Sequence, residues 1–474
     1  MDYEIVIGLE VHVQLKTKTK AFCGCSTVFG SQPNMQTCPV CLGFPGSLPV
    51  LNEAALELAY KAGIALDCQI QPFTKFDRKN YYYPDLPKNY QISQYDLPLA
   101  LNGYLDIEYD GINKRVKIKR VHLEEDAGKL IHEEDCSLVD YNRAGIPLLE
   151  IVTEPDINSP REAYEYLASL KSILKYLGVS DCDMEKGFLR CDANISLRKA
   201  GETALGTKAE LKNMNSFKGV KDALAYEINR QKELLEEGKK IIQETRLWNT
   251  ASQKTFTMRS KEEAMDYRYF PEPDLPPFTI SEEKIRQLKS ALPELPKQVS
   301  SRFIKDYSLN TTDAGILTAE KALAEYFESC VKIYPKPKTI GNWLIGALTA
   351  ELNSRAIEAR NIPIKTHDLI SLIKFAEEGK ISNLIAKDVL KTMFDTGKAP
   401  DEIINEKDLA QVSDANQLEE AINKVITENA KSTADYKAGK TNAMMFLVGQ
   451  VMRQTKGKAN PNVVQEILKE KLKT

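Results

Sequence analysis

The first strand that the sequence predicts places a carboxylate and an imidazole side by side. In residues 5–15, apolar residues occupy every second position, and the alternate phase contains Glu10 and His12. Successive side chains of a strand point to opposite faces, so Glu10 and His12 share the face opposite the apolar row. A carboxylate oxygen and a ring nitrogen at this spacing are a ligand pair for a divalent cation.

Two later segments, residues 189–198 and 207–212, repeat this division into a polar and an apolar face. The polar positions are Arg190, Asp192, Asn194, Ser196, Lys208, Glu210 and Lys212. An antiparallel sheet with one buried and one solvated face explains the pattern without any function. At this level the functional and the structural interpretations both stay open.

Carboxylates gather further along the chain. The run Glu124-Glu125-Asp126 follows a predicted strand over 115–123 whose alternation slips at residues 120–121, as at a β-bulge. Bulges often re-aim side chains near active sites. Glu150 stands in another apolar strand, over 146–153. Because carboxylates packed together without a cation have raised pKa values and cost stability, the sequence predicts a bound Mg²⁺.

A nucleotide site also needs cations for the phosphates. The segment 434–441 ends in Gly-Lys-Thr but has Ala434 where a P-loop needs its first glycine, so we interpret it as a turn before a helix. Adjacent cations, Arg78 and Lys79, stand among aromatic residues in the tract 75–84, Lys-Phe-Asp-Arg-Lys-Asn-Tyr-Tyr-Tyr-Pro. The tract predicts either phosphate ligands or a surface loop with stacked tyrosines.

Four of the nine cysteines form two close pairs. Cys23-Gly-Cys25 and Cys38-Pro-Val-Cys41 are separated by twelve residues. Four thiolates suit tetrahedral Zn²⁺ and leave no open position for water, so we expect a structural zinc site. A zinc-dependent hydrolase is therefore the least favoured interpretation. The other cysteines show no pattern of a catalytic triad.

Composition favours a soluble globular protein. The chain has 474 residues, with 42% hydrophobic and 28% charged residues. Its start has no basic region before an apolar stretch, and no apolar run reaches the length of a membrane span, so we expect a cytoplasmic protein without a membrane contact. The odd number of cysteines, nine, argues for metal binding and free thiols over a disulfide scaffold.

The end of the chain is basic although the whole chain is not. Residues 437–474 contain eight Lys and Arg against two Glu, while the net charge of the chain is −3. A local basic surface is the footprint expected for contact with nucleic-acid phosphates. A solvated helix surface is the alternative.

The order of predicted elements indicates an α+β fold in three domains. Residues 1–292 alternate mainly antiparallel strands with few helices, such as one over 160–177 opened by the capping box Ser159-Pro-Arg-Glu162. Proline-rich segments mark the end of this domain, and helical spacing dominates 293–400. A small helical tail follows over 401–474, with helices predicted over 443–455 and from Pro461.

Several blocks make the chain similar to the GatB family. They are Val6-Ile-Gly-Leu-Glu-Val-His-Val13, Lys75-Phe-Asp-Arg-Lys-Asn-Tyr81, Tyr90-Gln-Ile-Ser-Gln94, His122-Leu-Glu-Glu-Asp-Ala-Gly-Lys129, Leu189-Arg-Cys-Asp-Ala-Asn194, Lys212-Asn-Met-Asn-Ser-Phe217, Asp266-Tyr-Arg-Tyr-Phe-Pro271, Phe446-Leu-Val-Gly-Gln450 and Gly457-Lys-Ala-Asn-Pro461. The resemblance covers nearly the whole chain. It implies a catalytic cradle domain, a helical domain and a YqeY-like tail that contacts tRNA.

The resemblance also implies an activity and partners. It implies ATP-dependent amidation of Glu-tRNA(Gln), Asp-tRNA(Asn) or both, with ammonia from the amidase partner GatA and with the small protein GatC as a further partner. On this interpretation Glu10, His12, Glu125 and Glu150 are the first choice as Mg²⁺ ligands. The further expected site residues are Glu124, Arg78, Lys79 and Lys208 around ATP, and Asp192 and Glu210 lining the cradle.

A non-catalytic, zinc-bearing scaffold that binds tRNA is the alternative function. It explains the cysteine quartet and the basic tail. It leaves the aligned Glu, His, Asp and Lys residues of the sheet face without a role.

Overall fold

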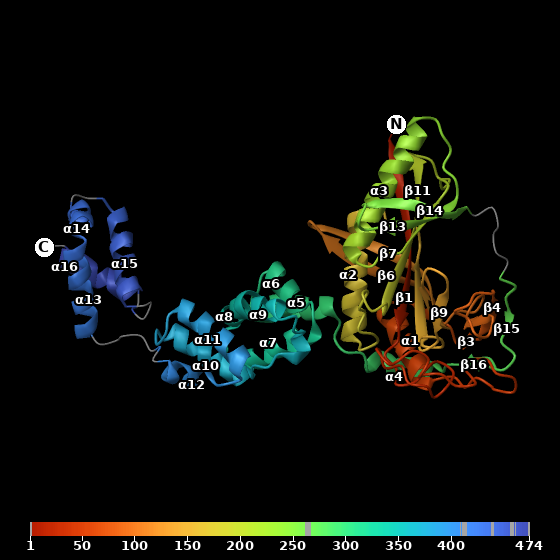
Figure 1. Cartoon of the computed structure of the whole chain (residues 1–474), viewed down its shortest axis with the longest axis horizontal. Coiled ribbons are helices and arrows are strands. Elements are labelled where there is room, and N and C mark those ends of the chain that lie inside the picture. Colours follow the sequence, from red (N-terminus) through yellow and green to blue (C-terminus); the bar gives the residue numbers. More distant parts are fainter. Residues whose placement is uncertain are drawn as a thin grey trace. The chain divides into compact units, whose positions relative to one another are not determined.

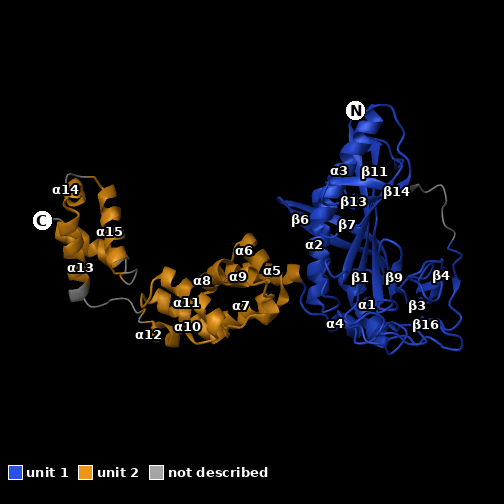
Figure 2. Ribbon diagram, viewed as in Figure 1, with its two compact units in different colours: residues 1–295 blue, residues 296–474 orange. Residues whose placement is uncertain are grey.

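The computed structural model describes residues 2–260, 267–407, 409, 415–437, 440–455, 459 and 461–472. The chain divides into two compact units, Met1–Leu295 and Pro296–Thr474 (Figure 2). This division lies close to the boundary that the proline-rich segments suggest after residue 292. None of the described helices is long and apolar enough to cross a membrane.

The first unit is built around a large sheet (Figure 1). Its strands are β1 (Tyr3–Gln14), β2 (Gln69–Ile70), β3 (Phe73–Thr74), β4 (Asp77–Asn80), β5 (Tyr90–Ser93), β6 (Ala100–Tyr109), β7 (Ile112–Glu125), β8 (Lys129–His132), β9 (Ser137–Asp140), β10 (Pro147–Thr153), β11 (Leu189–Lys199), β12 (Ala209–Lys212), β13 (Glu244–Asn249), β14 (Lys254–Ser260), β15 (Phe270–Pro271) and β16 (Phe278–Thr279). Its helices are α1 (Glu53–Ala65), α2 (Pro160–Tyr176), α3 (Phe217–Glu236) and α4 (Glu282–Ser290).

Among the described residues, nine strands form this sheet, in the order β14-β13-β12-β11-β1-β10-β7-β6-β2. All neighbouring pairs are antiparallel except β12 and β13. These two run parallel because the chain between them forms α3, and a helical crossover returns the strand in the same direction. The mainly antiparallel α+β fold is therefore confirmed, and β1 lies near its centre.

Helices cover one face of the sheet. In the apolar phase of β1, Ile7, Leu9 and Val11 are buried in a core shared with residues of α1, α2 and α3, and Ile5 is half-buried against it. Helix α2 begins where its sequence predicts, because Ser159 Oγ accepts a hydrogen bond from the backbone N–H of Glu162 (3.1 Å). The opposite, polar face of the sheet holds the candidate site.

A β-bulge interrupts β7 next to that site. Val152 pairs with Arg120 and Thr153 with Ile118, so Lys119 is an extra residue opposite β10. Ile118 and Val121 are buried while Lys119 is exposed and Arg120 half-buried, so two consecutive residues lie on the polar side. The slip in the apolar pattern at residues 120–121 thus predicted a real bulge, which the structure places one residue earlier, at Lys119.

The described parts of the second unit are helical, as the spacing of apolar residues predicts (Figure 1). Its helices are α5 (Pro296–Tyr307), α6 (Thr311–Leu317), α7 (Lys321–Ile333), α8 (Pro337–Trp343), a π-helical turn (Leu344–Leu348), α9 (Thr349–Ser354), a 3₁₀ turn (Ala359–Asn361), α10 (Thr366–Glu377), α11 (Asn383–Thr396), α12 (Pro400–Glu406), α13 (Ala415–Glu428), α14 (Ala430–Lys437), α15 (Asn442–Gln454) and α16 (Pro461–Leu472).

The tail has a hydrophobic core of its own. Residues of α13, α15 and α16 form a separate buried cluster that includes Ile422, Leu447 and Leu468. Helix α12 packs against α10 and α11, so the middle group of helices continues past the boundary suggested after residue 400. The predicted helices over 443–455 and from Pro461 correspond to α15 and α16.

A buried ion network fastens α3 to the edge of the sheet. Arg246 of β13 donates to Glu244 (2.6 Å) and lies 3.4 Å from Glu227 of α3, which is fully buried. Arg230 forms two further hydrogen bonds to Glu227, of 2.9 and 2.6 Å. Removing one member of such a network leaves the others charged, buried and unpaired.

We therefore expect Arg246→Met to destabilise the first unit by about 3–5 kcal/mol. The exposed pair between Arg115 and Asp106 offers a matched control, and Arg115→Met should cost about 0–1 kcal/mol. Urea unfolding followed by fluorescence of the buried Trp248 on β13 measures both. Equal midpoints for the two variants would show that the network does not hold α3 in place.

Candidate active site and metal centre

Carboxylates and imidazoles from three neighbouring strands meet on the polar face of the sheet. His12 of β1 pairs with Glu150 of β10, which pairs with His122 of β7, so the three residues form a row across the strands. Both imidazoles have Nε2 close to Glu150 Oε2, at 3.3 Å for His12 and 3.5 Å for His122. Glu10 and Glu124 lie 3.7 and 3.9 Å from His12 Nε2.

This cluster has the donor set of a divalent-cation site. Glu10, His12 and Glu150 have ligand atoms within 4.8 Å of one another, and so do His122, Glu124 and Glu150. The carboxylate oxygens suit Mg²⁺ or Mn²⁺, and the imidazole nitrogens are donors for divalent first-row transition metals. Glu150 belongs to both groups and is therefore the centre of the cluster.

The charges of the cluster shift the pKa values of its members in opposite directions. Burial alone would raise the pKa of Glu150, but His122, His12 and Arg120 stabilise its charge and hold this pKa well below its usual range. Burial raises the pKa of Glu10, and the nearby charge of Glu150 adds to the effect. Burial alone would lower the pKa of His12, but the hydrogen bond to Glu150 and the charges of Glu124 and Glu10 raise it to about 9. His12 thus holds a proton among three carboxylates, and binding of a divalent cation would have to displace that proton.

Asp192 and Glu210 extend this polar face beyond β1. Asp192 pairs with Glu10 across β11 and β1. Lys212 Nζ donates to Asp192 and lies 3.3 Å from Glu210 Oε1. Thr245 of β13 donates a hydrogen bond to Glu210 (2.8 Å). The structure therefore brings Asp192 and Glu210 together beside Glu10, around one ammonium group.

Glu125 does not belong to this cluster, although it follows Glu124 directly. Adjacent residues of a strand point to opposite faces, so Glu125 leaves the face of Glu124. Its buried carboxylate accepts hydrogen bonds from Lys88 and from the backbone N–H of Ile92 (2.9 Å). This corrects the expectation that Glu125 shares a cation with Glu10, His12 and Glu150.

The alternation of core-facing and polar-face residues in β7 could have separated Glu125 from Glu124 and His122. Beyond the bulge, Val121 and Leu123 are buried in the core, and Glu125 continues their phase. His122 and Glu124 therefore fall on the polar face. Alternation counted from the bulge onward places His122 on the polar face, although His122 is not among the site residues expected from the sequence.

The two cations of the aromatic tract have different environments. The Arg78 guanidinium donates hydrogen bonds to Glu272 (2.7 and 2.8 Å) and to Asp274 (3.0 Å). Lys79 has no carboxylate within ion-pair distance among the described residues, and its Nζ lies 4.9 Å from the ring centre of Tyr267. Of the pair, Lys79 is the one available to an anionic ligand.

A chain of tyrosine contacts starts near Lys79, but the one tyrosine of the tract that takes part, Tyr81, makes an edge contact and not a stack. Tyr81 contacts Tyr267, Tyr267 contacts Tyr269, and Tyr269 stacks on Tyr95 with ring centres 4.2 Å apart. Burial raises the pKa of Tyr269, and the charges of Glu124 and Glu150 add to it, which places this ring beside the acidic cluster. Tyr267 and Tyr269 thus lie between Lys79 and the acidic cluster.

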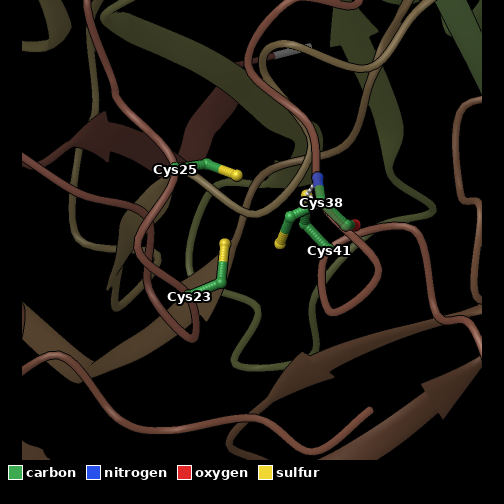
Figure 3. A group of neighbouring side chains, drawn as sticks. All are labelled: Cys23, Cys25, Cys38 and Cys41. Carbon is green, nitrogen blue, oxygen red and sulfur yellow. Dashed lines mark hydrogen bonds between the residues drawn. The ribbon is translucent and has the colours of Figure 1, made fainter. Parts of the chain in front are cut away.

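The four paired cysteines converge, as Figure 3 shows. Their sulfur atoms lie within 4.8 Å of one another, and those of Cys38 and Cys41 are 3.9 Å apart. A tetrahedral thiolate site with bonds of about 2.3 Å has edges of roughly 3.8 Å. A hydrogen bond from Cys23 lowers the pKa of Cys41 to about 4, and buried Lys20 adds to the effect. The quartet fits a structural metal ion.

Comparison with known proteins identifies the family of the chain. A family model described as the GatB/GatE catalytic domain matches residues 5–286, more than half of the chain, and a second, described as a GatB domain, matches residues 325–472. The chain belongs to the GatB family. The second model covers helices from α7 to α16 and so includes the tail.

GatB relatives match along their whole length. The chain is 57% identical over 473 residues, covering 100% of both chains, to the B subunit of the aspartyl/glutamyl-tRNA(Asn/Gln) amidotransferase of Caldanaerobacter subterraneus subsp. tengcongensis. It is 55% identical over 476 residues, covering 99% of each chain, to the protein of the same name from Carboxydothermus hydrogenoformans.

The basic end of this GatB-family chain is only partly described. Lys440 pairs with Asp435, and Lys471 lies 3.6 Å from Glu419. Of the other basic residues, Lys456, Lys458 and Lys473 lie outside the described residues, as does most of the block 457–461 and the first residue of the block 266–271. Contact of the tail with nucleic acid stays a prediction.

We expect the purified chain to hold one thiolate-bound metal ion. Cys41→Ser should reduce the metal content to near zero, because a tetrahedral site loses a ligand. Cys136→Ser removes an exposed thiol outside the quartet and should leave the content unchanged. Elemental analysis of the two variants decides, and equal metal content in both would exclude the quartet as the site.

Proposed function

We propose that this chain is the subunit that activates a misacylated aminoacyl-tRNA for amidation, with ATP and Mg²⁺ as cosubstrate and cofactor. The observation that carries the proposal is the buried cluster around Glu150, beside cations that can meet phosphate. The names of the relatives support Glu-tRNA(Gln), Asp-tRNA(Asn) or both as substrates. The product is the matching Gln-tRNA(Gln) or Asn-tRNA(Asn).

A free carboxylate reacts poorly with ammonia because hydroxide is a poor leaving group. The carboxylate must therefore be activated first. An oxygen of the side-chain carboxylate bonds to the γ-phosphorus of ATP while the bond from that phosphorus to the bridging oxygen breaks, giving an acyl phosphate and ADP. Ammonia then forms the C–N bond. Phosphate leaves with the electrons of the C–O bond, and a proton is released. Phosphoryl transfer mainly requires positioning and neutralisation of charge.

The residues of the polar face divide these tasks. Glu10, His12, Glu124 and Glu150 would hold Mg²⁺, with His122 beside them. The ion supplies charge for the phosphate oxygens when it is bound. Lys79 neutralises the charge of the phosphate. Asp192 and Glu210, which lie around Lys212, receive ammonia or support the metal.

Partners complete the reaction. An amidase, GatA, supplies ammonia, and the small GatC completes the heterotrimer in the cytoplasm. The subunit designation of the relatives supports such an assembly. Zn²⁺ in the cysteine quartet supports the fold without taking part in the reaction, because four thiolates leave no open position. The basic tail contacts the tRNA backbone.

We expect Glu150→Gln to lower the rate of amidation by about 100-fold or more, because the centre of the cation site loses its charge. Binding of the tRNA should stay within about twofold, because tRNA affinity comes mainly from phosphate contacts elsewhere. The assay uses the chain assembled with GatA and GatC, together with Glu-tRNA, ATP, Mg²⁺ and free ammonium in place of glutamine.

Glu108→Gln is the matched control. Glu108 is an exposed carboxylate on β6 of the same sheet, and its loss should leave the rate unchanged. Omitting ATP should abolish the product. ATP-dependent product that persists in Glu150→Gln would move the reaction away from this face and favour the scaffold interpretation.

A further inference from the structure

One lysine of the first unit is completely buried beside the cysteine quartet. Lys20 lies in the loop that leads from β1 to Cys23 and Cys25, and its side chain is 0% exposed. Among the described residues it is the only lysine that is fully buried. Lysine is almost never fully buried unless it is paired with an anion. Lys20 therefore needs an anionic group close to its ammonium.

The carboxylates around Lys20 do not supply that anion. In the part of the chain that the structure describes, no Asp or Glu oxygen lies within ion-pair distance of Lys20. Its Nζ donates to Cys41 Sγ (3.7 Å) and to the carbonyl oxygen of Tyr141 (3.2 Å). The nearby buried carboxylate of Glu125 pairs with Lys88 instead. Because a neutral carbonyl oxygen offers no full charge, the sulfur of Cys41 is the group that can carry the anion.

Cys41 is also the member of the quartet that gains most from a cation. It is buried, whereas Cys23, Cys25 and Cys38 are only half-buried and can be solvated in part. Its Sγ accepts a further hydrogen bond, from the backbone N–H of Cys38 (3.2 Å). Two donors therefore point at the sulfur atom that water reaches least.

The charge of a filled site makes this contact favourable. Four thiolates outweigh the charge of one divalent ion, so the filled quartet is negative. A buried charge is costly unless an opposite charge lies close to it, and Lys20 supplies one. In a quartet without metal and with protonated thiols, Lys20 is instead a buried cation that lacks a partner, which destabilises the fold.

The local fold holds Lys20 in this position. Its backbone N–H donates to the carbonyl oxygen of Cys25 (3.0 Å), and Asn52 Nδ2 donates to its carbonyl oxygen (3.1 Å). The aliphatic part of the side chain lies against Gly145, where a Cβ would be 3.5 Å from Lys20 Cδ and 3.6 Å from Cys41 Cβ. The ammonium is thus fixed between the two loops that carry the cysteines.

We propose that Lys20 is the counter-ion of the metal centre. Its ammonium stabilises the Cys41 thiolate and so raises the affinity of the quartet for a thiophilic divalent ion such as Zn²⁺. Lys20 acts through Cys41 and is therefore a positioning residue. The proposal goes beyond the proposed amidation, in which the quartet takes no part, and it rests on the presence of a metal ion in the quartet.

The affinity for Zn²⁺ tests the role of the charge. The full-length chain is stripped of metal under reducing conditions, and a chromophoric chelator then competes with it for added Zn²⁺. Lys20→Met removes the charge at a similar side-chain volume and should weaken Zn²⁺ binding by about 10- to 100-fold. Lys20→Gln keeps a hydrogen-bond donor without the charge and should weaken it similarly. Lys18→Met is the matched control, because Lys18 is exposed and lies two residues earlier, and its affinity should be unchanged.

A cycle of unfolding experiments separates the charge from the packing of the side chain. Lys20→Met should lower the urea midpoint of the zinc-loaded chain, because the thiolate loses its counter-ion. In the Cys41→Ser chain the same change should raise the midpoint, because there it removes an unpaired buried cation. Fluorescence of Trp248 follows both transitions and shows that each variant is folded. Equal losses in the two backgrounds would overturn the proposal, since the lysine would then only support the loop of Tyr141.

The remaining outcomes separate this proposal from the proposed function. Zn²⁺ affinities of Lys20→Met and Lys20→Gln that equal that of Lys18→Met would overturn the role of Lys20. A wild-type chain that binds no Zn²⁺ would refute the quartet as a metal site, and the counter-ion with it. Neither result bears on amidation, which the Glu150→Gln assay tests independently.

Discussion

The register between β1 and its two neighbours is the constraint on which the site depends. The apolar phase of β1 must face the core under α1–α3, so Glu10 and His12 must face the other way. Pairing with β10 then sets Glu150 opposite His12. A slip of one residue would bury the ligands and expose the core row, which makes the register costly to change. The fold therefore stabilises the site and the core through the same hydrogen bonds.

Charge pairing within the polar face decides which groups remain for substrates. Arg78 is held by Glu272, and Lys212 by Asp192 and Glu210, so these cations maintain the shape of the face. Lys79 lies against tyrosine rings and keeps its charge available. An anionic substrate gains most from cations that need not give up an existing partner, because exchanging one ion pair for another yields little net free energy.

The face that holds Glu125 serves a different purpose. The buried ion pair between Glu125 and Lys88 lines a cavity of about 160 Å³, together with Cys23 and Cys41 of the quartet. A tetrahedral metal ion can tie the loops that carry the cysteines, which have few regular hydrogen bonds of their own. The strand β7 thus joins the two sites, because the consecutive carboxylates at its end serve opposite faces.

Local patterns in the sequence determined the strand β1, the cap of α2, the bulge in β7 and the cysteine quartet, because alternation, capping and ligand spacing act over a few residues. Only the tertiary structure decided that β7 and β10 are neighbours with His122 opposite Glu150, that Arg78 is bound to Glu272, and that Lys119 borders a cavity. These outcomes depend on strand order, register and partners distant in the chain, such as Glu272 for Arg78. Local spacing carries no information about them, since ion pairing and cavity formation are settled only when remote segments pack together.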